Sequence, residues 1–240
     1  MQIITIASQT GGTGKTTTAA ALAHAAARKG RKVLAIDLDA QSNLSFIMKV
    51  TGPGSDLLLS GKDPTELIQH TAAGVDVIPG SQNLALEARG CASRLETALA
   101  PLKQQYDMII IDTPTSSREL LQNALQASTG LIIPLTADAF CVKSLYYTVH
   151  TVRQIQADSN LKLVILGFIF TQHESRSNLA REFQKLIIEK AAEIGVPYLG
   201  AVRQAIVVRE AAALHASLFE YAPKSKPAQD YMQIFDALNI

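Results

Sequence analysis

A run of small and polar residues near the N-terminus has the composition of a phosphate-binding loop. Residues 8–17 read Ser-Gln-Thr-Gly-Gly-Thr-Gly-Lys-Thr-Thr, between an apolar run at 3–7 and an alanine-rich segment at 18–28. Glycine tolerates left-handed backbone angles, so such a loop can turn successive N–H groups toward phosphate oxygens at the start of a helix. We therefore predict a strand, a loop and a helix that together bind the phosphates of a nucleotide.

Within this loop, each residue type suits one part of a bound nucleotide. Lys15 would reach the β- and γ-phosphates, and the Thr16 hydroxyl would bind Mg²⁺. The residues predicted to line the phosphates are Gly11, Gly12, Thr13, Gly14, Lys15, Thr16 and Thr17. The common pattern G-x-x-x-x-G-K-[ST] has a glycine where Gln9 stands. A flexible turn is the simpler interpretation of a lone glycine cluster, but here the flanking strand and helix agree with phosphate binding.

Two further apolar runs end in carboxylates, which are the ligands that Mg²⁺ prefers. The run at 32–37 continues into Asp37-Leu-Asp39, and the run at 106–112 ends in Asp112. Only one of the first pair is expected to face the site, and we choose Asp39. Asp112 would hold Mg²⁺ opposite Thr16, although many strand-end aspartates only cap the next helix.

Composition limits the class of protein. The chain has 240 residues, of which 48% are hydrophobic and 18% charged, and a net charge of +1. A soluble globular protein with a substantial core is expected, without a global preference for nucleic acid or anionic membrane. Cys91 and Cys141 have neither zinc-site nor disulfide-scaffold spacing, which favours a reducing cytoplasm. We expect no export and no membrane-spanning segment, because no leader and no sufficiently long apolar run is present.

Strand-like and helix-like segments alternate along the whole chain. Strands are expected at 3–7, 32–37, 75–79, 106–112, 131–135, 161–170 and 197–202. Helices are expected at 17–29, 56–59, 65–70, 84–102, 117–127, 142–157, 175–194, 207–216 and 227–238. We predict one P-loop ATPase domain over residues 1–240, of α/β class, with a doubly wound, mainly parallel sheet of about seven strands flanked by helices.

With these motifs in place, the sequence resembles the ParA-type partition ATPases of the ParA/MinD class over nearly its full length. Residues 9–17 are similar to that family's Q-K-G-G-x-G-K-T-T, a deviant Walker A motif, and residues 33–43 to its V-L-x-I-D-x-D-P-Q-G-N. Residues 107–114 are similar to D-x-x-I-I-D-x-P, and residues 220–231 have the family's closing pattern. Four motifs in the family's order make the resemblance specific.

The resemblance implies an ATPase that needs ATP and Mg²⁺. Lys15 and Asp39 would be the catalytic residues, with Asp39 orienting or activating the attacking water. Thr16 and Asp112 would hold the metal, and Gln172 and Arg203 would lie near the base. A partner such as a centromere-binding or cargo adaptor protein would stimulate hydrolysis, and the ATP form would bind DNA nonspecifically. The basic residues near the C-terminus that we assign to DNA are Arg203, Arg209, Lys224 and Lys226.

The principal departure from the family is Thr10, which stands where the family has its signature lysine. In ATP-bound dimers of the family, that lysine crosses to the γ-phosphate of the partner. We therefore expect a weaker ATP-dependent homodimer and slow hydrolysis without a partner, unless Lys143, Arg118 or Arg176 supplies the charge. Ala40 and Ser42, in place of proline and glycine, are milder departures.

Other function classes fit less well. A MinD-like membrane positioner would need a basic amphipathic C-terminal helix, but residues 229–240 contain two aspartates and no lysine or arginine. Iron–sulfur carriers need closely placed cysteines. A biosynthetic P-loop ligase would need a pocket for a carboxylate substrate, which the sequence does not reveal. Another cargo-positioning ATPase, or a regulatory relative with weak hydrolysis, stays open as an alternative.

Overall fold

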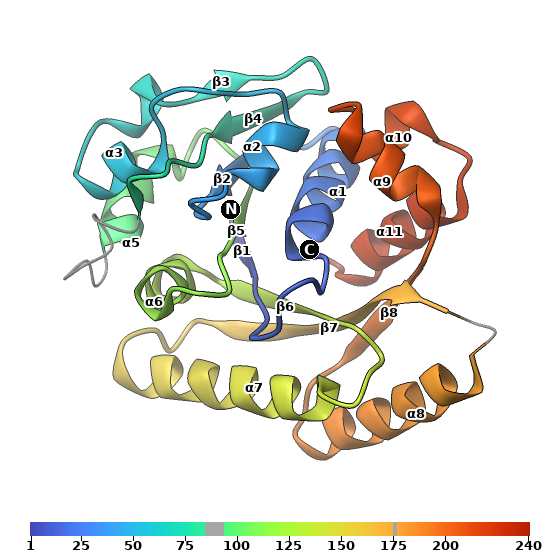
Figure 1. Ribbon diagram of the computed structural model, residues 1–240. Coiled ribbons are helices and arrows are strands. Elements are labelled where there is room, and N and C mark those ends of the chain that lie inside the picture. The colour runs from blue at the N-terminus through green and yellow to red at the C-terminus, as the bar shows by residue number, and fades with distance from the viewer. Residues whose placement is uncertain (85–93, 175–176) are drawn as a thin grey trace.

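A single sheet organises the protein, whose computed structural model describes residues 1–84, 94–174 and 177–240. Within these ranges the strand order is β3-β4-β2-β5-β1-β6-β7-β8 (Figure 1). The strands are β1 Gln2–Ile6, β2 Val33–Asp37, β3 Gln69–His70, β4 Val75–Ile78, β5 Met108–Asp112, β6 Gly130–Leu135, β7 Val164–His173 and β8 Tyr198–Arg203. All neighbouring strands are parallel except β3 and β4, which are antiparallel.

Helices cover both faces of the sheet (Figure 1). One face carries α1 Lys15–Arg28, α2 Asn43–Ile47, α9 Ile206–Ala213, α10 Leu218–Tyr221 and α11 Lys226–Ala237. The other face carries α3 Ser55–Leu59, α5 Arg94–Leu99, α6 Arg118–Ala127, α7 Cys141–Asp158 and α8 Asn178–Glu193. Two short 3₁₀ helices, Pro64–Glu66 and Ala100–Leu102, complete the described elements.

The predicted fold class is confirmed, with an eighth strand in addition to the seven predicted. The helix predicted at 65–70 is wrong: the 3₁₀ helix ends at Glu66, and Gln69 and His70 pair with β4 instead. The Asp63 side chain caps this short helix by accepting a hydrogen bond from the Thr65 N–H. Residues 69–70 then pair with the edge of β4, where they form backbone hydrogen bonds. Of the helix predicted at 84–102, residues 85–93 lie outside the described residues. The last part becomes 3₁₀ at Pro101.

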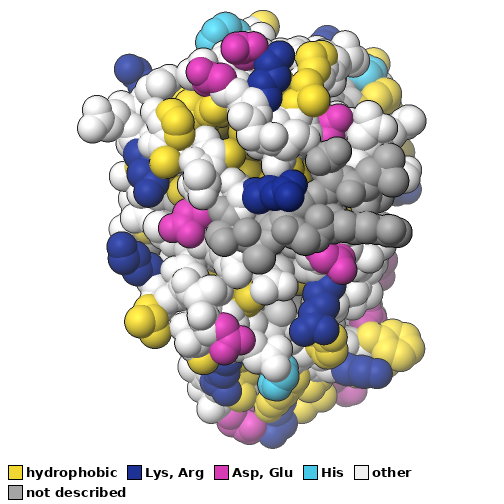
Figure 2. Space-filling model, turned by 90° about the vertical axis from the view of Figure 1, so that its left-hand side faces the viewer, with side chains coloured by type: hydrophobic (Ala, Val, Ile, Leu, Met, Phe, Trp, Pro, Cys, Tyr) yellow, Lys and Arg dark blue, Asp and Glu magenta, His cyan; other side chains and the backbone are white. Residues whose placement is uncertain are grey.

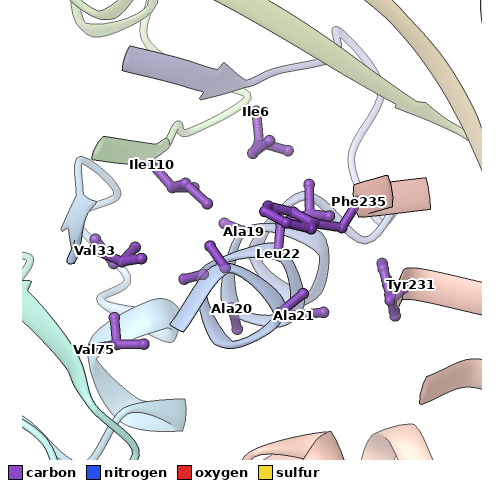
Figure 3. Packing of buried hydrophobic residues seen from close by; sticks show 14 of the residues in the cluster. Ile6, Ala19, Ala20, Ala21, Leu22, Val33, Val75, Ile110, Tyr231 and Phe235 are labelled. Carbon is purple, nitrogen blue, oxygen red and sulfur yellow. The ribbon is translucent and has the colours of Figure 1, made fainter. Parts of the chain in front are cut away.

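Helix α1 is buried between the sheet and α11. Its buried residues include Ala19, Ala20, Ala21, Leu22, Ala23, Ala25 and Ala26. Figure 3 shows this packing, with Ile6, Val33 and Ile110 on the sheet side and Tyr231 and Phe235 on the α11 side. Because alanine side chains are short, the helix can lie close to both neighbours without leaving cavities. The start of α1 is thereby fixed at the end of β1.

The connections of the sheet determine where a ligand can bind. Strand β1 lies between β5 and β6, and the chain fills the β2 side first and the β6–β8 side later. In doubly wound sheets, ligands bind at the carboxyl ends of the strands where the direction of winding reverses. The loop after β1 leaves the sheet at this point. Asp112, the last residue of β5, lies opposite Ile6 of β1 on one side and Asp37 of β2 on the other, so the carboxyl ends of these three strands are level.

Candidate nucleotide-binding site

The glycine loop has the backbone geometry of an anion cradle. Gly12 has φ 75° and Gly14 has φ 74°, both in the left-handed region. Gly11 is not among the glycines with positive φ, so two of the three loop glycines carry the left-handed turns. Gly14 is the N-cap of α1 and makes no side-chain cap, so the first N–H groups of the helix are available to an anion.

The loop is held from two sides. Ser8 and Thr13 share a hydrogen bond between their hydroxyls of 2.6 Å. At the end of β7, the Thr171 hydroxyl donates to the Thr13 carbonyl at 2.8 Å, and Gln172 Nε2 donates to the Gly12 carbonyl at 2.7 Å. Gln172 has φ 52°, a conformation that costs energy for a side chain with a Cβ and is retained here by its surroundings. These contacts join the loop to the far half of the sheet.

Lys15 is buried at 8% exposure, and its ammonium group is held by neutral oxygens. Nζ donates to Thr115 Oγ1 at 2.8 Å and to the Thr10 carbonyl at 3.2 Å. Burial lowers the pKa of Lys15, while the carboxylates of Asp112 and Asp39 raise it. The sequence reasoning missed Thr115, although its position directly after the Asp-Thr-Pro run that ends β5 was an available signal.

The two aspartates at the end of β2 have different surroundings. Asp37 is fully buried and accepts hydrogen bonds from the Ser45 N–H and hydroxyl, at 2.9 and 2.7 Å, and from the Asp39 N–H at 3.0 Å. Burial raises the pKa of Asp37, and the bonds from Ser45 lower it in part. Asp39 is partly exposed and accepts from the Gln41 N–H at 3.0 Å. Asp37 therefore fixes the loop that presents Asp39.

Asp112 is a buried carboxylate beside the Thr16 hydroxyl. It is 0% exposed, and neither of its oxygens accepts a hydrogen bond of normal geometry from the described residues. Burial raises the pKa of Asp112 and so does the charge of Asp37, while the Thr16 hydroxyl and the Lys15 charge lower it. Among the described residues no cluster of three or more acidic, histidine or cysteine side chains could hold a metal. A site made of Thr16 and Asp112 fits Mg²⁺, which takes few protein ligands and completes its shell with phosphates and water.

A cleft of about 530 Å³ brings most of the predicted phosphate-site residues together. Its lining is Gly12, Gly14, Lys15, Thr16, Thr17, Asp39, Asn43, Phe46, Ile47, Thr115, Gln172 and Ala212. A smaller cavity of about 210 Å³ shares Gly14, Thr17 and Gln172 with it and continues to Arg203 and Arg209. A larger hollow of about 720 Å³ lies by α3 and α5, but it contains none of the motif residues and no glycine-loop backbone. The chemistry therefore points to the first two cavities.

The four basic residues assigned to DNA do not form one free patch. Arg203 and Arg209 line the smaller cavity, and the Arg203 guanidinium is paired with Asp230 at 2.8 Å. Lys224 and Lys226 are exposed at the turn into α11. On the face that includes α3 and α5, Figure 2 shows Lys and Arg side chains interspersed with Asp and Glu. Among the described residues, this view shows no area of uniform positive charge.

Two of the three basic residues that could replace the missing lysine lie on the surface. Lys143, in the first turn of α7, and Arg118, at the start of α6, are both exposed. Arg176 and Cys91 lie outside the described residues. Cys141 is buried and packs in the α7 cluster, where burial raises the pKa of its thiol.

The strand, glycine loop, buried helix and strand-end aspartates together define a P-loop nucleotide-binding protein of the α/β class. Residues 1–165 match the sequence profile of a family described as an AAA domain. The sporulation initiation inhibitor protein Soj of Bacillus subtilis is 32% identical over 97% of this chain and 96% of its own length. The chromosome partitioning protein ParA of Myxococcus xanthus is 30% identical over 97% and 86%. The chain belongs to this AAA-domain family, among the Soj and ParA partition ATPases.

Solved structures agree with this assignment. An ATP complex of a McdA variant from Cyanothece has a TM-score of 0.86 at 25% identity, covering 100% of this chain and 97% of that one. Cobyrinic acid a,c-diamide synthase from Mycobacterium smegmatis with bound ADP and magnesium has a TM-score of 0.83 at 28% identity, covering 100% and 94%. The septum site-determining protein MinD from Pyrococcus horikoshii, complexed with Mg-ADP, gives 0.81 at 27%, covering 98% and 94%. In this chain, none of the described helices combines the length and apolar character needed to cross a bilayer.

Proposed function

We propose that this chain is a cytoplasmic ATPase that binds Mg-ATP at the glycine loop and uses its hydrolysis to partition DNA. The observation that carries this proposal is the cleft that unites Lys15, Thr16 and Asp39 at the uncapped start of α1. Asp112, whose pKa is lowered in part by the Thr16 hydroxyl and the Lys15 charge, would supply a carboxylate for the metal. Relatives named for chromosome partitioning, and similar structures with ATP, ADP or magnesium, support it.

The chain's own residues would act mainly by position and charge, as phosphoryl transfer requires. The N–H groups of residues 11–17 would surround the phosphates, and Lys15 would leave Thr115 and the Thr10 carbonyl for the β- and γ-phosphates. Bound Mg²⁺, held by Thr16 and Asp112, would neutralise phosphate charge. Asp39 would accept a hydrogen bond from the attacking water and so orient it toward the γ-phosphate. Gln172 and Arg203 would lie toward the base.

Two substitutions separate binding from hydrolysis. Lys15→Ala should lose ATP binding or turnover, because it removes the cation that the loop itself places on the phosphates. Asp39→Ala should keep ATP bound while phosphate release falls, since the water is positioned in the transition state more than in the ground state. The exposed Asp158→Ala serves as a control. Near-normal ATP affinity and turnover in Lys15→Ala would contradict the proposed cradle.

For DNA, we propose nonspecific binding in the ATP state through exposed basic residues near the C-terminus, with Arg209, Lys224 and Lys226 as the unpaired candidates beside Arg203. Affinity should then fall steeply with salt and be independent of sequence. A centromere-binding or cargo adaptor protein would stimulate hydrolysis. Absence of ATP-dependent retention on duplex DNA at low salt would argue for a different cargo.

A MinD-like membrane role finds no support in α11. The charged residues of this helix are Lys226, Asp230 and Asp236, and Asp236 is paired with Lys29 of the chain at 2.7 Å. Its apolar residues Tyr231, Ile234 and Phe235 are buried in the core beside α1. A membrane anchor needs the opposite, an exposed apolar face with basic flanks.

A further inference from the structure

His24 is a buried titratable residue that the proposed nucleotide site does not use. It lies in α1, is 4% exposed, and its Nδ1 makes no hydrogen bond of normal geometry with the described residues. Burial lowers the pKa of His24, while the Ala20 carbonyl, one turn earlier, and the charge of Glu220 raise it in part. The neutral imidazole is the form that fits this position, because a buried cation without a close partner is unfavourable.

The His24 side chain borders a small cavity between α1 and the helices α9 and α10. Figure 1 shows these helices on the same face of the sheet, and α10 packs against α1. The cavity has a volume of about 20 Å³, room for about one water molecule. Its lining is Thr17, Ala20, Ala21 and His24 of α1, Ile47 of α2, Val208, Ala211 and Ala212 of α9, and Ala216, Ser217 and Leu218 at the entry to α10. Most of this lining is apolar, so it offers few acceptors for an additional imidazole N–H.

This cavity lies next to both spaces of the nucleotide site. Thr17 lines it and also lines the phosphate cleft and the cavity of about 210 Å³. Ala212 of α9 is shared with the cleft, and Val208 of α9 is shared with the cavity of about 210 Å³. A movement of α9 away from α1 would therefore change one wall of each space.

The charged and titratable groups on the elements around His24 give its proton little compensation. They are Lys15 and Arg28 at the two ends of α1, Arg209 and Glu210 on α9, His215 in the turn after α9, and Glu220 and Tyr221 on α10. Helix α2 has no charged residue. Glu220 is the carboxylate whose charge favours protonated His24, and it is exposed to water, which screens it. His215 bonds the Phe46 carbonyl of α2 through Nδ1, so its protonation would hold α2 more firmly.

We propose that His24 is a proton-sensitive lock between α1 and the helices α9 and α10. While His24 is neutral, α9 and α10 pack on α1 and the cavity is closed. When His24 gains a proton, the additional N–H lacks an acceptor in the cavity, so α9 and α10 separate from α1 and water reaches the cation. In the separated form His24 has an ordinary histidine pKa of about 6.5, so a fall from pH 7.5 to 5.5 should raise the population of this form by up to about tenfold.

The test is amide hydrogen exchange of the full chain without nucleotide at pH 5.5 and 7.5, corrected for the intrinsic effect of pH on exchange. In wild type, the protection of residues 206–221 should be up to about tenfold lower at pH 5.5, and that of the sheet should change less. His24→Leu and His24→Gln take up no proton and should show no such loss. His215→Gln, and His150→Gln on the exposed face of α7, should behave like wild type.

Three results would overturn this inference. They are equal protection of residues 206–221 at both pH values, the same loss in both His24 variants, and a loss of equal size in the sheet, which would be global unfolding. If neither His24 variant folds, the ring protons of His24 are titrated by NMR in wild type: a pKa below that of His150 would support the lock, and an equal pKa would overturn it. No nucleotide takes part in these measurements, so an error in the proposed nucleotide cleft would not change them.

Discussion

Asp112 illustrates how one residue can oppose folding and serve binding. Its carboxylate is buried without a hydrogen-bond partner among the described residues, and burial raises its pKa. Above the unfolded pKa of about 3.9, the unfolded chain releases this proton while the folded state keeps it until the raised folded pKa is reached. Stability of the ligand-free protein should therefore fall as the pH rises from that value through the raised folded pKa. A bound cation would remove this cost.

Asp112→Asn should accordingly stabilise the ligand-free protein at pH 7 while abolishing Mg²⁺-dependent ATP binding. A buried unsatisfied polar group costs about 1–3 kcal/mol, and in a chain of this size each kcal/mol moves the melting temperature by about 2–4 °C. Thermal melts from pH 5 to 8 with and without Mg-ATP measure both effects, with the exposed Asp158→Asn as control. A lower melting temperature at pH 7 without ligand would show that Asp112 has a stabilising partner.

Thr115 should compete with the nucleotide for Lys15. Its hydroxyl accepts from Lys15 Nζ at 2.8 Å, and a hydrogen bond to a charged group is worth about 1.5–3 kcal/mol. Thr115→Val should then bind ATP more tightly, by up to roughly ten- to a hundredfold, and Thr115→Ser should restore wild-type affinity. Titration of the three proteins measures this. Weaker binding by Thr115→Val would instead make Thr115 a phosphate contact.

At this scale, contiguous residues could be predicted and distant partners could not. The glycine loop and Lys15 follow one another in the sequence, so their roles are readable from spacing alone. Thr115 is 100 positions from Lys15, and Asp230 is 27 positions from Arg203. Only the fold brings these pairs together. Strand alternation does not distinguish Asp37 from Asp39, because the two are two positions apart; β2 ends at Asp37, and the Ser45 bonds to Asp37 could not be predicted from the sequence.

At the scale of elements, the β2–α2 loop depends on a close approach by Gly80, two residues after the end of β4. Gly80 N–H donates to Ser45 Oγ at 2.8 Å, and Ser45 in turn bonds Asp37. A Cβ at Gly80 would meet the Asp39 carbonyl at 2.8 Å and Asp37 Cγ at 2.9 Å. The backbone carbonyl of Asp39 cannot rotate away as a flexible side chain can, so a side chain at position 80 would displace the β2–α2 loop.

Gly80→Ala should therefore reduce hydrolysis more than ATP binding, because it displaces Asp39 and leaves the glycine loop in place. Phosphate release and ATP affinity are compared with those of Ser81→Ala, the neighbouring substitution that adds no atom near Asp39. An equal fall of both quantities would mean that the β2–α2 loop supports the whole cleft rather than Asp39 alone.

Helices and strands with long apolar or alanine-rich runs could be predicted from the sequence, whereas short elements without such runs could not. The buried strands read as continuous apolar runs, and α1 as an alanine-rich segment after a loop. Strand β3 has only two residues, which pair with β4 across a turn. Two residues are too few to show the alternation of apolar and polar side chains by which a strand is recognised in a sequence. The predicted strand begins at 161 because Leu161 is apolar, but β7 begins at Val164. In the structure Leu161 lies before the strand and is 89% exposed.

For the whole molecule, the absence of a lysine at position 10 bears on assembly. The Thr10 carbonyl already accepts from Lys15 and from one of the Ser8 and Thr13 hydroxyls, and the threonine has no charge to offer a second nucleotide. We expect the homodimer with ATP to be weaker than that of Thr10→Lys, by roughly ten- to a hundredfold if one charge-assisted contact is gained. Sedimentation with a nonhydrolysable ATP analogue measures this, with Thr10→Gln as a neutral control. A tight wild-type dimer that Thr10→Lys does not strengthen would turn attention to Lys143, Arg118 and Arg176.

The central claim, that the cleft beside α1 holds Mg-ATP, is tested most directly by a crystal structure with Mg²⁺ and a nonhydrolysable ATP analogue. The predicted result has Lys15 Nζ moved from Thr115 to the β- and γ-phosphates, Mg²⁺ on the Thr16 and Asp112 side, and the base beside Arg203. Nucleotide bound elsewhere, such as in the hollow by α3 and α5, or Lys15 still bonded to Thr115 with nucleotide present, would contradict it.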